Sequence, residues 1–547
     1  MLMPLEKASI VNFLDELKKL LGEIYVIDSL EQLVVKTRET GHVTHRPRAL
    51  VYPSCVSEVQ QVVHLANKHH CKIFACSRGQ NWGYGGNNLL DEDTVVIVLE
   101  RMNRILEVNE ELAYAVIEPG VTYEQLNRYL KERGYRLWID CIDGTPLGSV
   151  IGNALDRGIG ITPYGDHFAN LCGMEVVLPN GTLIHTGGSS PQHTINTWHT
   201  HKWGLGPYME GIFTQSNFGI VTQAGIWLMP QPQAYFSYIF EFDNDENLGS
   251  VIDCFRKLAL EGVVSSKLHL LSDFVYLTVL TQKIKEGLPK GHVRKEDLQK
   301  LRRKYGLTAW SGVAALYGNE AQLAIQKKIL RKELKPYGRL LVFSDWEVRW
   351  IEKLIKTCER FSILKTLLEK ISHRPLSMLS SFPHVHAGMK GNPTSYFLNH
   401  AYFKLAQDRP CNDVNPARDG VGLTWFAPVL PFTGKHVVPY LKESRAIFEN
   451  HGFDFYMAML MLNPRSIVCL MGILFDKENL EEVKRAQELY DELFRKLHEH
   501  RYEQYRAGIA CWERIWQDAP ELSAFYSLLK RAIDPNQVLA PGKYGIK

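Results

Sequence analysis

The chain has 547 residues, of which 45% are hydrophobic and 22% are charged, and its net charge is +3. This composition indicates a globular protein of two or more domains, and the balanced charge argues against a nucleic-acid partner. The ten cysteines contain no C-x-x-C pair, which argues against a zinc site and is typical of buried thiols in a reducing compartment.

Residues 1–22 alternate apolar and charged positions at helical spacing, which predicts an amphipathic helix rather than a signal peptide. The longest apolar stretch, 456–475, is interrupted by Asn463, Pro464 and Arg465. It therefore predicts two buried strands and no membrane span. From these two segments we expect a cytoplasmic protein.

Residues 45–120 alternate strand-like and helical patterns, and a further helical pattern follows them. Apolar runs predict strands at 48–54, 72–75 and 94–99. Periodic apolar positions predict helices at 55–70 and at 121–134. In the second helix we expect Thr122 as the N-cap and Gly134 as the stop signal.

The remainder of the chain is predicted to form a second α+β unit. Pro179-Asn180-Gly181 marks a hairpin turn, and the prolines at 229–233 mark a domain boundary. Charged, periodic patterns then predict helices at 296–306, 319–338 and 479–502. The last turn-rich residues, 532–546, are expected to pack on something specific rather than to fray.

Two glycine-rich segments carry the strongest chemical signal. Segment 77–88, "SRGQNWGYGGNN", lies between two predicted strands, and segment 145–168 contains Gly148, Ser149, Gly152 and Asn153. Glycine lets backbone N–H groups approach a bound phosphate, although the first segment alone is also explained as a hairpin loop. Neither segment has the Rossmann G-x-G-x-x-G spacing, so we expect a dinucleotide other than a nicotinamide.

Five segments in the same order resemble the vanillyl-alcohol oxidase / p-cresol methylhydroxylase group of FAD flavoproteins: 77–87, 148–168, 172–188, 202–232 and 534–546. The resemblance covers nearly the whole chain and is weaker over 240–400. It implies an α+β fold, in which a two-part FAD-binding domain surrounds an α+β cap (substrate) domain. The implied parts are 1–235 and 496–547 for the FAD-binding domain and 236–495 for the cap.

The resemblance also implies which residues bind FAD. They come from the two glycine-rich segments, from one later strand and from the C-terminal turn: Ser77, Arg78, Gly79, Gln80, Asn81, Gly83, Gly85, Gly148, Ser149, Gly152, Asn153, Gly158, Tyr164, Gly219, Ile220 and Lys543. Relatives often attach the flavin covalently to a histidine or tyrosine. Leu423 and Gln80 stand at the two usual attachment points, and Cys411 is the one nucleophile in 403–434. We therefore expect FAD to be bound non-covalently.

Members of this group oxidise para-substituted phenols by hydride transfer from the benzylic carbon to flavin N5. Hydride loss is easy only from the phenolate, so a cation must meet the phenolic oxygen, with tyrosine hydroxyls adding charge-assisted hydrogen bonds. The resemblance assigns these roles to Arg506, Tyr84 and Tyr505. It also aligns Asp143 with an aspartate that activates water for attack on the quinone methide. Asp140 is a competing residue, and a turn-forming role explains Asp143 equally well.

Three further features are less decisive. Trp425 matches an aromatic residue near the flavin, but core packing explains it as well. Arg465 and Ser466 stand where relatives have a pair of histidines that line the active site; the arginine either meets a substrate carboxylate or serves as a salt-bridged structural residue. The pairs His199/His201 and His384/His386 lack a third ligand, so we expect surface or loop histidines and no metal.

The leading hypothesis is thus an FAD-dependent oxidase or dehydrogenase that acts on a small 4-alkylphenol or 4-hydroxybenzyl alcohol. A flavin enzyme of the same fold acting on a non-phenolic biosynthetic alcohol or amine is the first alternative. An electron-relay flavin subunit is the second. The electron acceptor, O₂ or cytochrome c, stays open, and the resemblance implies a homo-oligomer such as a dimer.

Overall fold

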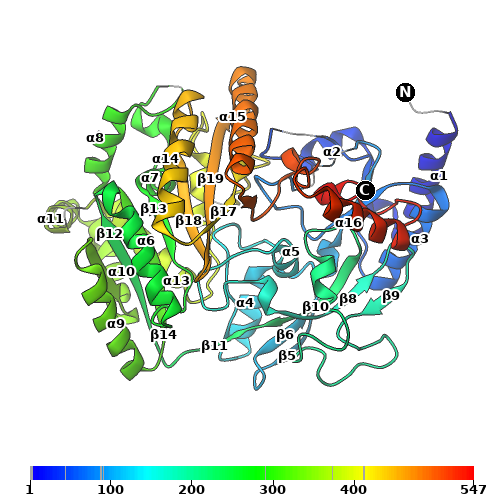
Figure 1. Ribbon diagram of the computed structural model, residues 1–547, viewed down its shortest axis with the longest axis horizontal. Helices are drawn as coiled ribbons and strands as arrows, with labels where there is room; N and C mark the ends of the chain where they lie inside the picture. Colours follow the sequence, from blue (N-terminus) through cyan, green and yellow to red (C-terminus); the bar gives the residue numbers. More distant parts are fainter. Residues whose placement is uncertain are drawn as a thin grey trace.

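The computed structural model describes residues 4–42, 45–86, 89, 91–289, 291–372, 374–410 and 413–547. Figure 1 shows two parts side by side: the N-terminal half together with the C-terminal end (blue, cyan and red), and the segment between them (green to orange). Both parts combine helices with sheets, so the predicted α+β class is confirmed.

The first sheet lies at the N-terminal end of the molecule. Its strand order is β1 (Val26–Ile27), β2 (Ala49–Val51), β4 (Val95–Val98), β3 (Ile73–Cys76), and β2, β4 and β3 run parallel. Helices α1 (Pro4–Leu21) and α3 (Val56–His69) pack on it through one apolar core. The predicted amphipathic helix and the predicted strands of this region are confirmed.

The second sheet is antiparallel. Its order is β5 (Ile105–Asn109), β6 (Tyr114–Ile117), β10 (Ile220–Trp227), β8 (Leu171–Val177), β9 (Leu183–His185), so the hairpin at 179–181 is confirmed. Helix α4 (Tyr123–Glu132) begins where Thr122 Oγ1 accepts a hydrogen bond from Gln125 N, and Gly134 follows it with φ +74°. The short strands β7 (Leu137–Trp138) and β11 (Met229–Pro230) pair beside this sheet.

The third sheet forms the middle of the cap. Its order is β15 (Arg339–Phe343), β12 (Ala234–Phe242), β14 (Trp310–Gly318), β13 (His269–Ser272), β18 (Tyr456–Asn463), β19 (Ser466–Asp476), β17 (Pro428–Pro431), β20 (Glu503–Gln504), with β16 (Val421–Phe426) also on β19. Strands β18 and β19 are the two predicted halves of the apolar stretch 456–475. Among the described residues, no helix is long and apolar enough to cross a membrane.

Further helices connect these strands. They are α2 (Leu30–Lys36), α5 (Val150–Leu155), α6 (Leu248–Leu260), α7 (Asp273–Leu280), α8 (Lys295–Tyr305), α9 (Glu320–Leu334), α10 (Asp345–Arg360), α11 (Ser362–Ser372), α12 (Leu376–Leu379), α13 (Ser381–Gly388), α14 (Gly434–Asn450), α15 (Leu480–Glu499) and α16 (Pro520–Ile533). In Figure 1, α6, α9, α10 and α14 lie along the cap sheet, whereas α16 lies with the N-terminal part.

The C-terminal segment completes the first sheet. Ile73 N, in β3, donates to Val538 O at 2.8 Å, and Ala540 N donates to Ile73 O at 2.7 Å. Asn217 Nδ2 donates to Ala540 O and to Ile546 O, which ties the same segment to the loop before β10. The turn-rich end therefore packs on a specific partner, as predicted, and places Lys543 Nζ 4.9 Å from the centre of the Phe74 ring in β3.

Candidate active site

A cavity of ≈ 430 Å³ is lined by both glycine-rich loops and by one face of the cap sheet. On β18, the alternate residues Tyr456, Ala458 and Leu460 face it, as the period of a strand requires. Such a volume suits a small-molecule site. The cavity thus connects the predicted cofactor loops to the predicted catalytic residues.

Most of the residues predicted to bind FAD line this cavity: Ser77, Arg78, Gly79, Gln80, Asn81, Gly85, Gly148, Ser149, Gly152, Asn153, Gly219, Ile220 and Lys543. Gly83, Gly158 and Tyr164 lie outside the lining. Gly83 packs instead against the indole of Trp425, and a Cβ added at Gly158 would overlap the side chain of Asn153. Close packing therefore explains why glycine stands at these two positions.

The polar groups at this end fit FAD. Arg78 Nε and Gln80 Oε1 are buried, and within the described part of the chain neither has a hydrogen-bond partner. Buried polar atoms in native proteins nearly always have partners, so a ligand is expected to supply them. Lys543 is half-buried at the same end of the cavity, and the loss of solvent around its ammonium group lowers its pKa. A dinucleotide would supply acceptors for Arg78 and Lys543.

Arg506 lies in the same cavity, 7% exposed, among the residues predicted to hold a phenolate. Its Nη2 donates to Tyr505 Oη at 3.1 Å, and its Cζ lies 4.9 Å from the centre of the Tyr84 ring. Nε donates to Asp156 O at 2.9 Å and Nη1 donates to Asn81 Oδ1 at 3.1 Å. The fold thus brings together Tyr84, Tyr505 and Arg506 from segments more than 400 residues apart in the sequence.

The electrostatics of this cluster favour an anionic ligand. Burial raises the pKa of Tyr84 and of Tyr505, so both hydroxyls stay protonated and can donate hydrogen bonds. Burial opposes the charge of Arg506, but Tyr505, Asp156 and Tyr84 outweigh it and raise the pKa of the guanidinium. Among the described residues, no carboxylate forms an ion pair with Arg506. A buried cation of this kind is stabilised by an anion that binds beside it.

Asp143 lies at another part of the lining, with its side chain 48% exposed and Oδ2 3.4 Å from His269 Nδ1. Asp140, the competing carboxylate, is buried outside the lining. It accepts from Thr162 N at 3.2 Å and lies 3.1 Å from His167 Nε2. Asp140 therefore holds the second glycine-rich loop together, and Asp143 is the carboxylate that a substrate can reach.

Sequence reasoning missed His269, His400 and Tyr456, which line the cavity. The His400 ring lies 5.4 Å from the Trp425 ring and 5.5 Å from that of Tyr456. Its Nδ1 donates to Phe397 O at 2.8 Å, and burial lowers the pKa of the imidazole to about 4, so the ring is neutral at pH 7. Strand alternation through 456–463 was the available signal for Tyr456; no motif marks either histidine.

The two usual attachment points for a flavin, Gln80 and Leu423, both line the cavity, and neither side chain is a nucleophile. Cys411 lies outside the described residues. Trp425 lines the cavity and its backbone N donates to Gly83 O at 3.0 Å. The tryptophan therefore contributes to the lining and also packs against the first glycine-rich loop.

Two expectations are wrong. Arg465 is exposed in the turn between β18 and β19, away from the cavity lining, so it neither meets a substrate nor forms a structural ion pair within the described part of the chain. His386 is buried in helix α13 rather than on the surface or in a loop, whereas His199, although buried, lies in a turn. Among the described residues, no group of three side chains suited to a metal ion occurs.

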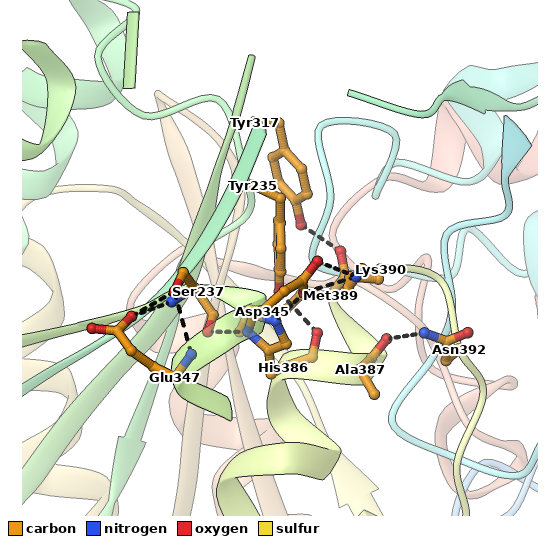
Figure 2. Close-up of polar contacts among 11 residues, drawn as sticks. Tyr235, Ser237, Tyr317, Asp345, Glu347, His386, Ala387, Met389, Lys390 and Asn392 are labelled. Carbon is orange, nitrogen blue, oxygen red and sulfur yellow. Dashed lines mark hydrogen bonds and ion pairs between the residues drawn. The ribbon is translucent and has the colours of Figure 1, made fainter. Parts of the chain in front are cut away.

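His386 belongs to a network that supports one wall of the cavity (Figure 2). Its Nδ1 lies 2.7 Å from Ser237 Oγ in β12, and its Nε2 lies 2.7 Å from Asp345 Oδ1 in α10. Lys390 Nζ donates to the same carboxylate at 2.8 Å. Helix α13 is thereby fixed to the cap sheet, and its Val385 and Gly388 line the cavity. The Ser–His–Asp order is structural here, because Ser237 is buried in the sheet outside the lining.

Comparison with known proteins agrees with this geometry. The sequence profile described as "FAD binding domain" matches residues 47–187. The chain is 33% identical to 1'-carboxy-chondrochloren decarboxylase of Chondromyces crocatus, over 100% of this chain and 98% of that protein. It is 30% identical to the 4-cresol dehydrogenase [hydroxylating] flavoprotein subunit of Pseudomonas putida, over 97% of this chain and 94% of that one.

The crystal structure of p-cresol methylhydroxylase with substrate bound superimposes with a TM-score of 0.87 at 28% identity, covering 99% of this chain and 98% of the other. The full-length match in sequence and in fold confirms the resemblance and the FAD cofactor. The protein belongs to the p-cresol methylhydroxylase-type family of FAD-dependent oxidoreductases.

Proposed function

We propose that this protein oxidises a para-substituted phenol, such as a 4-alkylphenol or a 4-hydroxybenzyl alcohol, by hydride transfer. The observation that carries the proposal is Arg506: a buried cation without a carboxylate partner among the described residues, beside the hydroxyls of Tyr84 and Tyr505. A phenolate oxygen has the charge and the acceptor capacity that these three side chains lack.

The chain's residues prepare the substrate for oxidation. Arg506 and the two tyrosine hydroxyls stabilise the phenolate, whose oxygen pushes electrons through the ring toward the para carbon. A hydride can then leave the benzylic carbon, which turns the phenolate into a para-quinone methide. FAD, when bound, supplies the hydride acceptor. We assign to Asp143, which lines the cavity beside His269, the role of taking a proton from a water molecule that adds to the quinone methide.

A second reaction is favoured by one observation. His269 lies beside Asp143, and its Nε2 is buried in the cavity wall with no partner among the described residues; as an N–H, this atom can donate a hydrogen bond to a substrate carboxylate. The relative from Chondromyces crocatus is named a decarboxylase. In a quinone methide that carries a carboxylate on the next carbon, the C–COO⁻ bond can break, releasing CO₂. Its electron pair then forms the alkene and restores the phenolate.

Anaerobic mixing tests the proposed function. We expect 4-cresol or vanillyl alcohol to bleach the visible absorbance of the bound flavin, whereas benzyl alcohol, which lacks the phenol, leaves it oxidised. With 3-(4-hydroxyphenyl)propanoate, formation of 4-vinylphenol identifies the decarboxylating route and a hydroxylated acid identifies water addition. Reduction by a non-phenolic alcohol or amine but by none of the phenols would refute the proposal.

We also propose that FAD is held without a covalent bond, because Gln80 and Leu423 occupy the attachment points of relatives. Denaturation in acid should therefore leave a yellow supernatant above a colourless pellet. A yellow pellet, with a flavin-mass adduct on a peptide containing Cys411 or any other residue, would contradict this prediction.

The electron acceptor and the assembly remain proposals. The relative from Pseudomonas putida is named a flavoprotein subunit, which supports a partner-borne acceptor such as a cytochrome c; O₂ is the alternative. We propose a homodimer on the resemblance alone. The domain limits 1–235, 236–495 and 496–547 likewise remain predictions, although strands β12 to β20 of the cap sheet span Ala234 to Gln504.

A further inference from the structure

The carboxylate of Asp156 acts electrostatically on Arg506 but forms no direct ion pair with it; the direct contact is made by the Asp156 main-chain O. Asp156 directly follows helix α5, in the middle of the second glycine-rich segment, and lines the cavity. Its Oδ2 accepts from Asn81 Nδ2 at 2.9 Å, and its Oδ1 accepts from Tyr544 Oη at 3.1 Å. Both carboxylate oxygens are thus engaged by side chains from distant parts of the sequence.

These bonds fix the direction in which Asn81 faces. Because Asn81 Nδ2 donates to the Asp156 carboxylate, its Oδ1 is the atom that accepts from Arg506 Nη1 at 3.1 Å. The main chain of Asp156 acts as well, since its O accepts from Arg506 Nε at 2.9 Å. Asp156 therefore holds the guanidinium from two sides, once directly and once through Asn81.

The C-terminal turn brings the hydroxyl of Tyr544 to this carboxylate. Tyr544 has φ +52°, a conformation that is costly for a bulky residue. Trp516 Nε1 donates to Tyr544 O at 2.7 Å and helps to hold it there. A strained tyrosine that is kept in place by its neighbours, with its hydroxyl on Asp156, indicates a functional constraint rather than a chance contact.

We propose that Asp156 is a positioning residue for phenol oxidation: through Asn81 it aims Arg506 at the phenolic oxygen, and its charge sets how strongly the site favours the phenolate. This inference rests on the proposed function. Because both oxygens of its carboxylate are engaged by Asn81 and Tyr544, we infer that Asp156 acts through Arg506 rather than on the phenol itself.

The charged and titratable groups around Arg506 and Asp156 determine in which direction the Asp156 charge shifts the pKa of a bound phenol. Those that act on Arg506 or Asp156 are Tyr84, Tyr123, Tyr505, Tyr544 and Lys543, with Asp166 acting on Tyr505. Burial raises the pKa of the four tyrosines, so they are neutral near pH 7. Removing the Asp156 charge leaves the positive field of Arg506 less opposed. A bound phenol should then lose its proton at lower pH.

The FAD-loaded protein is titrated with 4-nitrophenol, whose phenolate absorbance reports its own ionisation. Asp156→Asn keeps an acceptor for Asn81 but removes the charge, so we expect the apparent pKa of bound 4-nitrophenol to fall by about one unit. Asp156→Ala also removes the hydrogen-bond acceptor, so the side chains of Asn81 and Arg506 are no longer held in their orientations. We expect its affinity for 4-nitrophenol to fall by about tenfold or more. Asp408→Asn, at a side chain 77% exposed, is the matched control and should behave as wild type.

The outcomes separate the two claims. If wild type leaves bound 4-nitrophenol at its solution pKa, the proposed function fails and this inference fails with it. If wild type lowers that pKa but both Asp156 variants match wild type, the inference alone is overturned. Equal loss of affinity in both variants without any shift of pKa would show that Asp156 only supports the fold, which also overturns it.

Discussion

Arg506→Ala lowers kcat/KM for the oxidised phenol by at least about 100-fold, the usual effect of removing a preorganised charge stabiliser. The guanidinium is buried and, within the described residues, its partners are neutral: Asp156 O, Asn81 Oδ1 and Tyr505 Oη. Alanine removes the cation that makes the phenolate stable in this cavity. Steady-state kinetics with the best phenol, together with the flavin content of the purified protein, measure the effect.

Two variants make this result specific. Arg465→Ala removes an arginine that is exposed and lies outside the cavity lining, so its kinetics should match wild type. Arg506→Lys keeps the positive charge but loses the three hydrogen bonds of the guanidinium, so we expect partial activity. Unchanged kcat/KM in Arg506→Ala on every phenol that wild type oxidises would contradict the assignment.

Gly152→Val produces protein that purifies colourless or loses FAD on dilution. A Cβ at Gly152 would lie 2.7 Å from Ser77 Oγ and 3.1 Å from Ser77 Cβ, so a branched side chain forces the two glycine-rich loops apart. These loops line the predicted diphosphate end of the cavity from both sides. The ratio of flavin absorbance to protein absorbance, and the Kd for added FAD, measure the loss.

A matched glycine tests whether the effect is local. At Gly211 the nearest atom to an added Cβ is Tyr208 Cδ1 at 3.8 Å, so Gly211→Val should keep its flavin. Gly85→Val is expected to act like Gly152→Val, because Gly85 has φ +131° and lines the same cavity. A folded Gly152→Val protein that stays yellow with unaltered FAD affinity would show that this contact does not shape the cofactor site.

The sequence by itself determined the local structure. Apolar periodicity placed α3, α4 and α15, the turn residues 179–181 placed one hairpin, and residues 463–465 divided the apolar stretch 456–475 into two strands, because these signals act over a few neighbouring residues. The glycine-rich segments identified the loops of the cavity for the same reason. Tyr505 and Arg506, by contrast, entered only through the family resemblance, since an adjacent Tyr-Arg pair carries no signal of its own.

Only the tertiary structure decided which polar groups meet in the cavity. Asp156 and Tyr544 are 388 residues apart, and no local pattern predicts that one hydroxyl reaches the other's carboxylate. His269 and His400 face the lining because strand register and helix packing place them there, whereas Arg465 is carried to an exposed turn. Burial, pairing and charge compensation depend on contacts that form when distant segments pack, and the free energies of those contacts decide the chemistry of the site.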